Sequence, residues 1–161
     1  MKFVDFAQLV RPECHGAPDF IIERAVRDSA IDFCKRTGVY IPEPEEVSVI
    51  KGINEYEVSI PSGTELNYIT DVFADKTKLS PVSFPKLLEM VGDGNTRGVP
   101  SVYSQRDNAA FFVAPIPDTT DTLRVLYSLK PSPTSSSIPD TIGRENREAI
   151  VQGAIYRLQM M

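Results

Sequence analysis

His15 is the only histidine of this 161-residue chain, so a Ser-His-Asp or Cys-His catalytic site would have to use it as the general base. The candidate nucleophiles for such a site are Ser29 and Cys34. No serine lies in a Gly-x-Ser-x-Gly pattern, which places the nucleophile of many hydrolases on a sharp turn. His15 lies between Cys14 and the residues 16–18, a sequence typical of a turn before a helix. We therefore expect no catalytic residues.

The same residues do not have the spacing of a metal site. A zinc site would need Cys14, His15, Cys34 and a fourth ligand, yet the chain has no Cys-x-x-Cys or His-x-x-x-His pair. Four aspartates also lack the alternate spacing and terminal glutamate of a calcium loop: Asp71, Asp75, Asp93 and Asp107. We expect no bound metal. The two cysteines are too few to stabilise a secreted scaffold, and we expect them to be reduced and buried.

A glycine-rich segment has some of the residues of a nucleotide-binding loop. It consists of Gly92, Asp93, Gly94, Asn95, Thr96, Arg97 and Gly98. A dinucleotide fingerprint requires a strand before the glycines and a helix after them, whereas here a short helix is predicted before the loop and Pro100 follows it. The Gly-Lys-Ser/Thr of a P-loop is also missing. We expect no cofactor, and we interpret the segment as a flexible loop that lies at a subunit or tail interface.

Composition and charge exclude several classes of protein. The chain is 42% hydrophobic and 24% charged, as in folded proteins, and its net charge is −5. An acidic balance argues against a free-standing nucleic-acid binder, although Tyr103, Phe111, Phe112 and Tyr127 could stack on bases. The longest strongly apolar run, 109–117, is too short to span a membrane. We expect a soluble protein, made inside the cell, of one domain or one domain with a second lobe.

Helical patterns lie at both ends of the chain. Residues 18–38 have apolar residues at spacings of three and four, a basic last turn and Gly38 as a candidate C-cap. A shorter helix before them should end at Arg11-Pro12. A final helix should begin at Asp140 and run to Met161. No stop signal precedes Met161, so we expect the native chain to continue.

The middle of the chain alternates with period two, as strands do. Val47–Lys51 should pair with Glu55–Ile60 across residues 52–54, and Leu66–Phe73 and Leu123–Leu129 should form further strands. Phe111–Ala114 is apolar on both faces, which indicates a central strand. A short helix is expected at 85–91, with Ser83 as its cap. Residues 131–137 are predicted to be a low-complexity connector without an apolar anchor.

This order of elements predicts an α+β fold. We expect a helical lobe from both chain ends, 1–44 plus 132–161, and an antiparallel β lobe inserted at 45–131. The β lobe carries most of the net charge, with eight basic and twelve acidic residues.

Four sequence blocks, in order, resemble tailed-bacteriophage head-to-tail adaptor (connector) proteins. The first helix ends in Ala-x-x-Phe-Cys-x-x-Thr at residues 30–37, and an alternating strand with a proline-glycine turn follows at 56–63. The third block begins with Gly98-Val99-Pro100-Ser101-Val102-Tyr103. The last helix keeps Gly-Ala-x-x-Arg-Leu as Gly153, Ala154, Arg157 and Leu158.

The resemblance implies a non-enzymatic virion protein of the neck, assembled in the host bacterial cytoplasm. Copies would form a homo-oligomeric ring, expected to be dodecameric, between the portal protein and a tail, nozzle or tail-tube protein. Double-stranded DNA would pass through the lumen without sequence-specific contacts, which an acidic wall allows. The alternatives are another tail-completion or tail-terminator protein and, in a different class, a small hydrolase or ligand-binding domain that uses His15 and the glycine loop.

Within this interpretation the helical lobe is expected to contact the portal. Arg144, Arg147 and Arg157 are the predicted interface residues, because they recur along the last helix. The alternative is that they are solvated arginines with partners in their own helix, such as Glu148.

Overall fold

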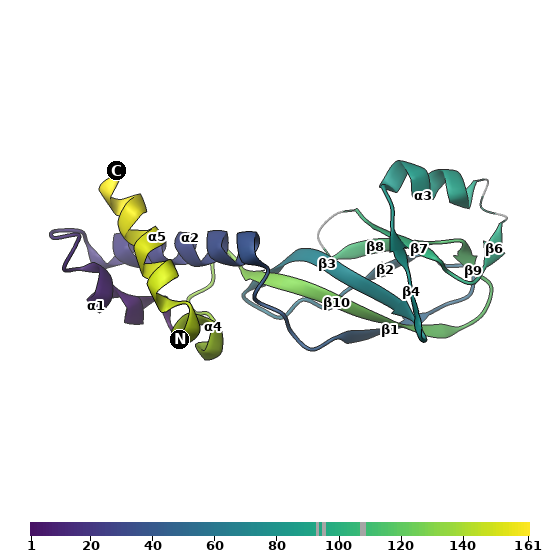
Figure 1. The fold of residues 1–161 in the computed structure, drawn as a ribbon, viewed down its shortest axis with the longest axis horizontal. Helices are drawn as coiled ribbons and strands as arrows, with labels where there is room; N and C mark the ends of the chain where they lie inside the picture. Colours follow the sequence, from purple (N-terminus) through teal and green to yellow (C-terminus); the bar gives the residue numbers. More distant parts are fainter. Residues whose placement is uncertain (93, 95, 107–108) are drawn as a thin grey trace. The chain divides into compact units, whose positions relative to one another are not determined.

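The computed structural model describes residues 1–92, 94, 96–106 and 109–161. The fold is of the α+β class, as predicted (Figure 1). Its helices are η1 (Phe3–Phe6, a 3-10 turn), α1 (Ala7–Val10), α2 (Asp19–Thr37), α3 (Phe84–Val91), α4 (Asp140–Glu145) and α5 (Arg147–Gln159). None of the helices in the described parts of the chain has the length and apolar character needed to span a bilayer.

Within the described residues, the strands form two four-stranded sheets and one small pair. The strands are β1 (Glu45–Val49), β2 (Glu55–Glu57), β3 (Thr64–Ala74), β4 (Thr77–Lys78), β5 (Ser80–Pro81), β6 (Arg97–Gly98), β7 (Val102–Gln105), β8 (Ala110–Ala114), β9 (Ile116–Pro117) and β10 (Asp121–Pro131). Their order is β1-β10-β3-β4 in one sheet, β2-β8-β7-β5 in the second, and β6-β9 in the pair. Pairing is mainly antiparallel, but β5–β7 and β6–β9 are parallel. β8 is an inner strand, as the apolar run at 111–114 predicted.

Contacts divide the chain into two compact units. The helical unit is Met1–Tyr40, Pro61–Asn67 and Leu129–Met161, and the β unit is Ile41–Ile60 and Tyr68–Ser128. The predicted lobes, 1–44 plus 132–161 and 45–131, remain a proposal about which parts fold together.

Helix α2 ends at the residue that local rules favour, and it begins one residue after the start of the predicted range. Pro18 is its N-cap in an extended conformation, and Gly38 is a left-handed C-cap with φ 63° and ψ 22°. The Gly38 amide donates to the Cys34 carbonyl at 2.9 Å. The face predicted to be apolar is buried at Ile22 and Val26 and packs in the core of the helical unit.

The predicted hairpin between residues 47–51 and 55–60 is wrong. β1 pairs with β10, whereas β2 pairs with β8 in the other sheet. The intervening loop is held by the Tyr56 hydroxyl, which receives a hydrogen bond from the Ile50 amide at 3.1 Å. The ring of Tyr56 packs against Phe111 with 6.0 Å between the ring centroids. Burial of this aromatic pair therefore takes β2 away from its neighbour in sequence.

The prediction of one continuous final helix is also wrong, because the helix is interrupted at Asn146. This residue has φ −115° and ψ 22°, and its side-chain amide donates to the Ile142 carbonyl at 3.0 Å. An asparagine side chain that bonds to the backbone competes with helix continuation. The break changes which residues face the core: Ala149 is exposed, while Val151 and Ile155 are buried.

The serine-rich segment 131–137 is not a free connector. Ser136 accepts a hydrogen bond from the Phe3 amide at 3.0 Å, and the Ser132 amide donates to the Gly63 carbonyl at 3.0 Å. The Nε of Arg27 donates to the Ser135 carbonyl at 2.7 Å. Hydrogen bonds to its backbone anchor this segment within the helical unit, and backbone bonds of this kind leave no pattern in the side chains of the segment.

Candidate interaction surfaces

The candidate catalytic residues of the sequence lie in different environments. Cys14 and His15 are in the turn before α2, where Cys14 is half-buried and His15 is exposed. Cys34 is fully buried near the end of α2, and burial raises its pKa from 9.0 to about 11. Both cysteines are free thiols. Ser29, the other candidate nucleophile, is buried and donates to the Ile150 carbonyl at 2.7 Å.

Metal ligands do not gather in the described residues. Residues 1–92, 94, 96–106 and 109–161 contain no group of three or more histidine, cysteine, aspartate or glutamate residues able to hold a metal ion. Asp93 and Asp107 lie outside the described residues. That the chain uses neither a catalytic set nor a metal stays a prediction.

Helices α2 and α5 of the helical unit pack against each other at Ser29 and Gly153. A Cβ added to Gly153 would lie 2.2 Å from the Ser29 Oγ. One turn later, Arg157 forms an ion pair with Asp32 at 3.4 Å and donates to the Gly153 carbonyl at 3.1 Å. Gly153 thus permits close packing of α5 on α2.

The three predicted portal-interface arginines do not share one helix edge. Arg144 is on α4 and Arg147 opens α5, on either side of the break, and both are exposed. Arg144 has an ion pair with Asp140 at 3.6 Å, and Arg147 has none among the described residues. Arg157 is half-buried against Asp32. A hollow of about 350 Å³ at residues 144–149 is lined by the first two and not by Arg157.

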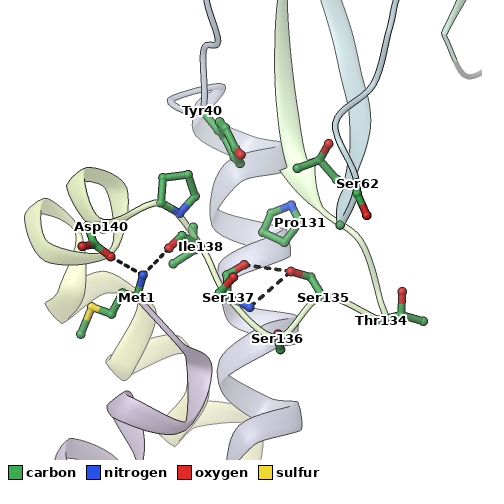
Figure 2. Close-up of a pocket in the computed structure, with 13 residues that line it drawn as sticks. Met1, Tyr40, Ser62, Pro131, Thr134, Ser135, Ser136, Ser137, Ile138 and Asp140 are labelled. Atoms are coloured by element: carbon green, nitrogen blue, oxygen red, sulfur yellow. Dashed lines mark hydrogen bonds and ion pairs between the residues drawn. The ribbon is translucent and has the colours of Figure 1, made fainter.

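A polar groove of about 550 Å³ lies in the helical unit (Figure 2). It is lined by Met1, Tyr40, the turn 62–64 and residues 131 and 134–140. The Met1 ammonium donates to the Ile138 carbonyl at 2.7 Å and forms an ion pair with the Asp140 carboxylate. The hydrogen bond from this ammonium, its charge and that of Arg144 lower the pKa of Asp140. The charged groups of the groove are therefore already paired.

Two neighbouring hollows form an apolar surface where α2 begins and α5 ends. They measure about 480 and 270 Å³ and share Ile21 and Met161. Phe20 and Met160, next to these residues in the chain, are each 70% exposed. Sequence analysis missed this surface. The available signal was the pair Phe20-Ile21, which directly precedes the buried Ile22 and so cannot share its face.

The glycine-rich segment is held at its end by strand pairing. Arg97 and Gly98 form β6, which pairs with Ile116 and Pro117 of β9. A Cβ added to Gly98 would lie 3.3 Å from the Pro115 Cγ, so the glycine allows a close approach. Asp93 and Asn95 lie outside the described residues. The placement of residues 92–98 at a subunit or tail interface stays a prediction.

Comparison with known proteins identifies the family of the chain. The family model of the SU10 adaptor protein matches residues 1–161, the whole length of the chain. A search of curated proteins finds no match. Because the match covers every element described above, the chain belongs to the SU10 adaptor protein family, a family of structural phage adaptors.

Proposed function

We propose that this protein is the head-to-tail adaptor of a tailed phage, a structural part of the virion neck that assembles in the host cytoplasm. Copies form a ring of twelve between the portal protein and the tail, and the genomic DNA passes through the ring. The observation that carries the proposal is the family match over the whole chain. The ordered resemblance in four sequence blocks supports it independently of the structure.

The helical unit is the proposed portal-binding part. Arg144 and Arg147 lie together at the α4–α5 corner, exposed beside the hollow at 144–149. Arg157 was predicted to share this role. Its ion pair with Asp32 also joins α5 to α2 within the unit. The apolar surface around Ile21 and Met161 lies at the opposite end of α5 from Arg147 and is a second area that a partner could bury.

The charge distribution suits a DNA conduit. The helical unit contains ten basic and ten acidic residues, and the β unit contains seven basic and twelve acidic residues. Phosphates are held by basic surfaces, so a wall with an acidic balance leaves DNA free to move. This is why we place the DNA path along the ring without specific base contacts.

Electron microscopy of the chain co-produced with its portal protein tests the proposal. We expect a twelve-fold ring attached to the portal, and we expect Arg144→Glu combined with Arg147→Glu to abolish attachment. The matched control is Lys35→Glu with Arg36→Glu, a double charge reversal on α2 of the same unit. A chain that binds tail tubes and leaves portals bare would instead be a tail terminator and would contradict the proposal.

A further inference from the structure

Three segments of the β unit meet at one end of its sheets. The loop 50–54 is bound to β9 by a hydrogen bond from the Gly52 amide to the Pro117 carbonyl at 2.9 Å. β9 in turn pairs with β6, which contains Arg97. The Arg97 guanidinium of β6 also lies against the loop 50–54, because a Cβ added to Gly52 would lie 3.6 Å from the Arg97 Nη1.

These segments carry aliphatic side chains that the fold leaves in solvent. Ile50 is 53% exposed, Ile53 is 44% exposed, and Val99, which directly follows β6, is 71% exposed. Arg97 is also exposed and forms no hydrogen bond or ion pair with any described residue. We call Ile50, Ile53, Arg97 and Val99 the tip surface. Single exposed aliphatic residues are ordinary. Three on contacting segments around a guanidinium that has no partner among the described residues are typical of a binding surface.

The loop that carries two of these residues is rigidly held. The buried Tyr56 hydroxyl accepts a hydrogen bond from the Ile50 amide at 3.1 Å, lies 3.2 Å from the Ile50 carbonyl and donates to the Ile53 carbonyl. The Ile53 amide donates to the Ile50 carbonyl at 3.1 Å. Ile50 and Ile53 are therefore presented in a fixed geometry, which lowers the entropy cost of binding a partner.

The tip surface lies at the end of the β unit remote from the points where the chain enters and leaves it. Those points follow residues 40, 60, 67 and 128. Glu45 lies at the end of the unit where the chain enters and leaves. It pairs with Val125, and its carboxylate accepts a hydrogen bond from the Ser59 amide at 2.9 Å. The opposite end of β1, where Val49 pairs with Asp121, leads into the loop 50–54. The tip surface is thus free of the connections to the helical unit.

We propose that the tip surface docks a tail-side protein of the virion through a segment with apolar side chains beside a carboxylate. This inference rests on the proposed adaptor function. The aliphatic residues need an apolar partner. Arg97, which pairs with none of the described residues, needs a carboxylate when water is excluded around it. Contact between two copies through the same surface is disfavoured, because it would bring two Arg97 guanidinium groups together.

Photocrosslinking in assembled particles tests this inference. A benzophenone amino acid replaces Val99, and crosslinked products are identified by mass spectrometry. We expect a product with a protein other than this chain, at a segment that contains an acidic residue among apolar ones. In this background Arg97→Glu should reduce the product about tenfold or more, as loss of an interfacial charge pair does. Lys86→Glu, the same charge change on α3 of the same unit, should leave it unchanged.

The same variants are tested in particle assembly. Arg97→Glu and, separately, Val99→Asp should give DNA-filled heads that carry the adaptor but lack tails. Val99 is the more exposed position, so Val99→Asp tests the surface if Arg97→Glu fails to fold. Crosslinks only to another copy of this chain, no crosslinks, or normal tails in both variants would overturn the inference. Wild-type protein absent from heads would overturn the adaptor function itself, which separates the two failures.

Discussion

At the residue scale, Ser29 and Gly153 determine how closely α2 and α5 approach. The Ser29 hydroxyl is within 2.2 Å of the position that a Gly153 Cβ would occupy, and it donates to the Ile150 carbonyl. The missing side chain of Gly153 therefore leaves space for the Ser29 hydroxyl. A larger residue at position 153 would displace this hydroxyl and break its hydrogen bond to Ile150.

We predict that Gly153→Ala lowers the free energy of unfolding by about 1–3 kcal/mol, because the added methyl group overpacks the contact. Adding Ser29→Ala should recover part of this loss, since the clashing oxygen is removed. Chemical denaturation of both single variants and the double variant measures the coupling. Gln152→Ala, an exposed change on the same helix, is the control. Additive losses in the double variant would show that the two residues do not share a contact.

The two cysteines should differ in thiol reactivity. Cys34 is fully buried and its pKa is raised to about 11, whereas Cys14 is half-buried. We expect an aromatic disulfide reagent at pH 8 to modify Cys14 in the native protein and Cys34 only after unfolding. Equal modification of both cysteines in the native state would contradict the buried position of Cys34.

The same pKa shift predicts a pH dependence of stability. Folding raises the pKa of Cys34 from 9.0 to about 11, so the native state holds this proton more tightly. Its contribution is fully present below about pH 9 and is lost as the pH rises from about 9 to 11. The stability difference between the wild type and Cys34→Ala should narrow over that window. Denaturation curves at several pH values measure this difference, and a constant difference would contradict the prediction.

At the element scale, the segment 131–137 takes its structure from the elements around it. It contains no helix and little apolar surface, yet the η1 backbone, the turn at Gly63 and Arg27 of α2 all bond to it. Arg27 also lies within 3.4 Å of the Glu23 carboxylate, an arrangement that holds the guanidinium toward the Ser135 carbonyl.

We predict that Arg27→Ala lowers the free energy of unfolding by about 1–2 kcal/mol, because it removes a charge-assisted hydrogen bond. Amide hydrogen exchange at 132–137 should become faster in this variant. Arg24→Ala is the matched control: Arg24 is 75% exposed and 4.0 Å from Asp28, so the change should cost less than about 0.5 kcal/mol. Unchanged exchange in Arg27→Ala would show that the other hydrogen bonds suffice to order the segment.

At the scale of the whole molecule, the two units differ in what they offer to partners. The helical unit has no net charge and presents arginines and an apolar surface, whereas the β unit is acidic and presents the tip surface. The proposed portal contact and the proposed tail contact therefore lie on different units. The variants Arg144→Glu with Arg147→Glu and Arg97→Glu should block different assembly steps, and particle microscopy distinguishes them.

The sequence by itself determined the features that depend on near neighbours. The α2 C-cap at Gly38, the buried side of β10 and the inner strand β8 all follow from spacings of a few residues. The fold class and the family resemblance also came from the order of such patterns. Local hydrogen bonds and side-chain periodicity act over one or two turns or strand residues, and so they are visible in a single chain.

Only the tertiary structure decided which distant segments meet. Strand β1 pairs with β10 rather than with β2, the helix after Asp140 breaks at Asn146, and segment 131–137 is anchored by backbone bonds. The tip surface depends on contacts between loop 50–54, β6 and β9, which are far apart in sequence. Alternative pairings of apolar strands differ little in local preference. The choice among them comes from shared burial in the core, as the packing of Tyr56 on Phe111 shows.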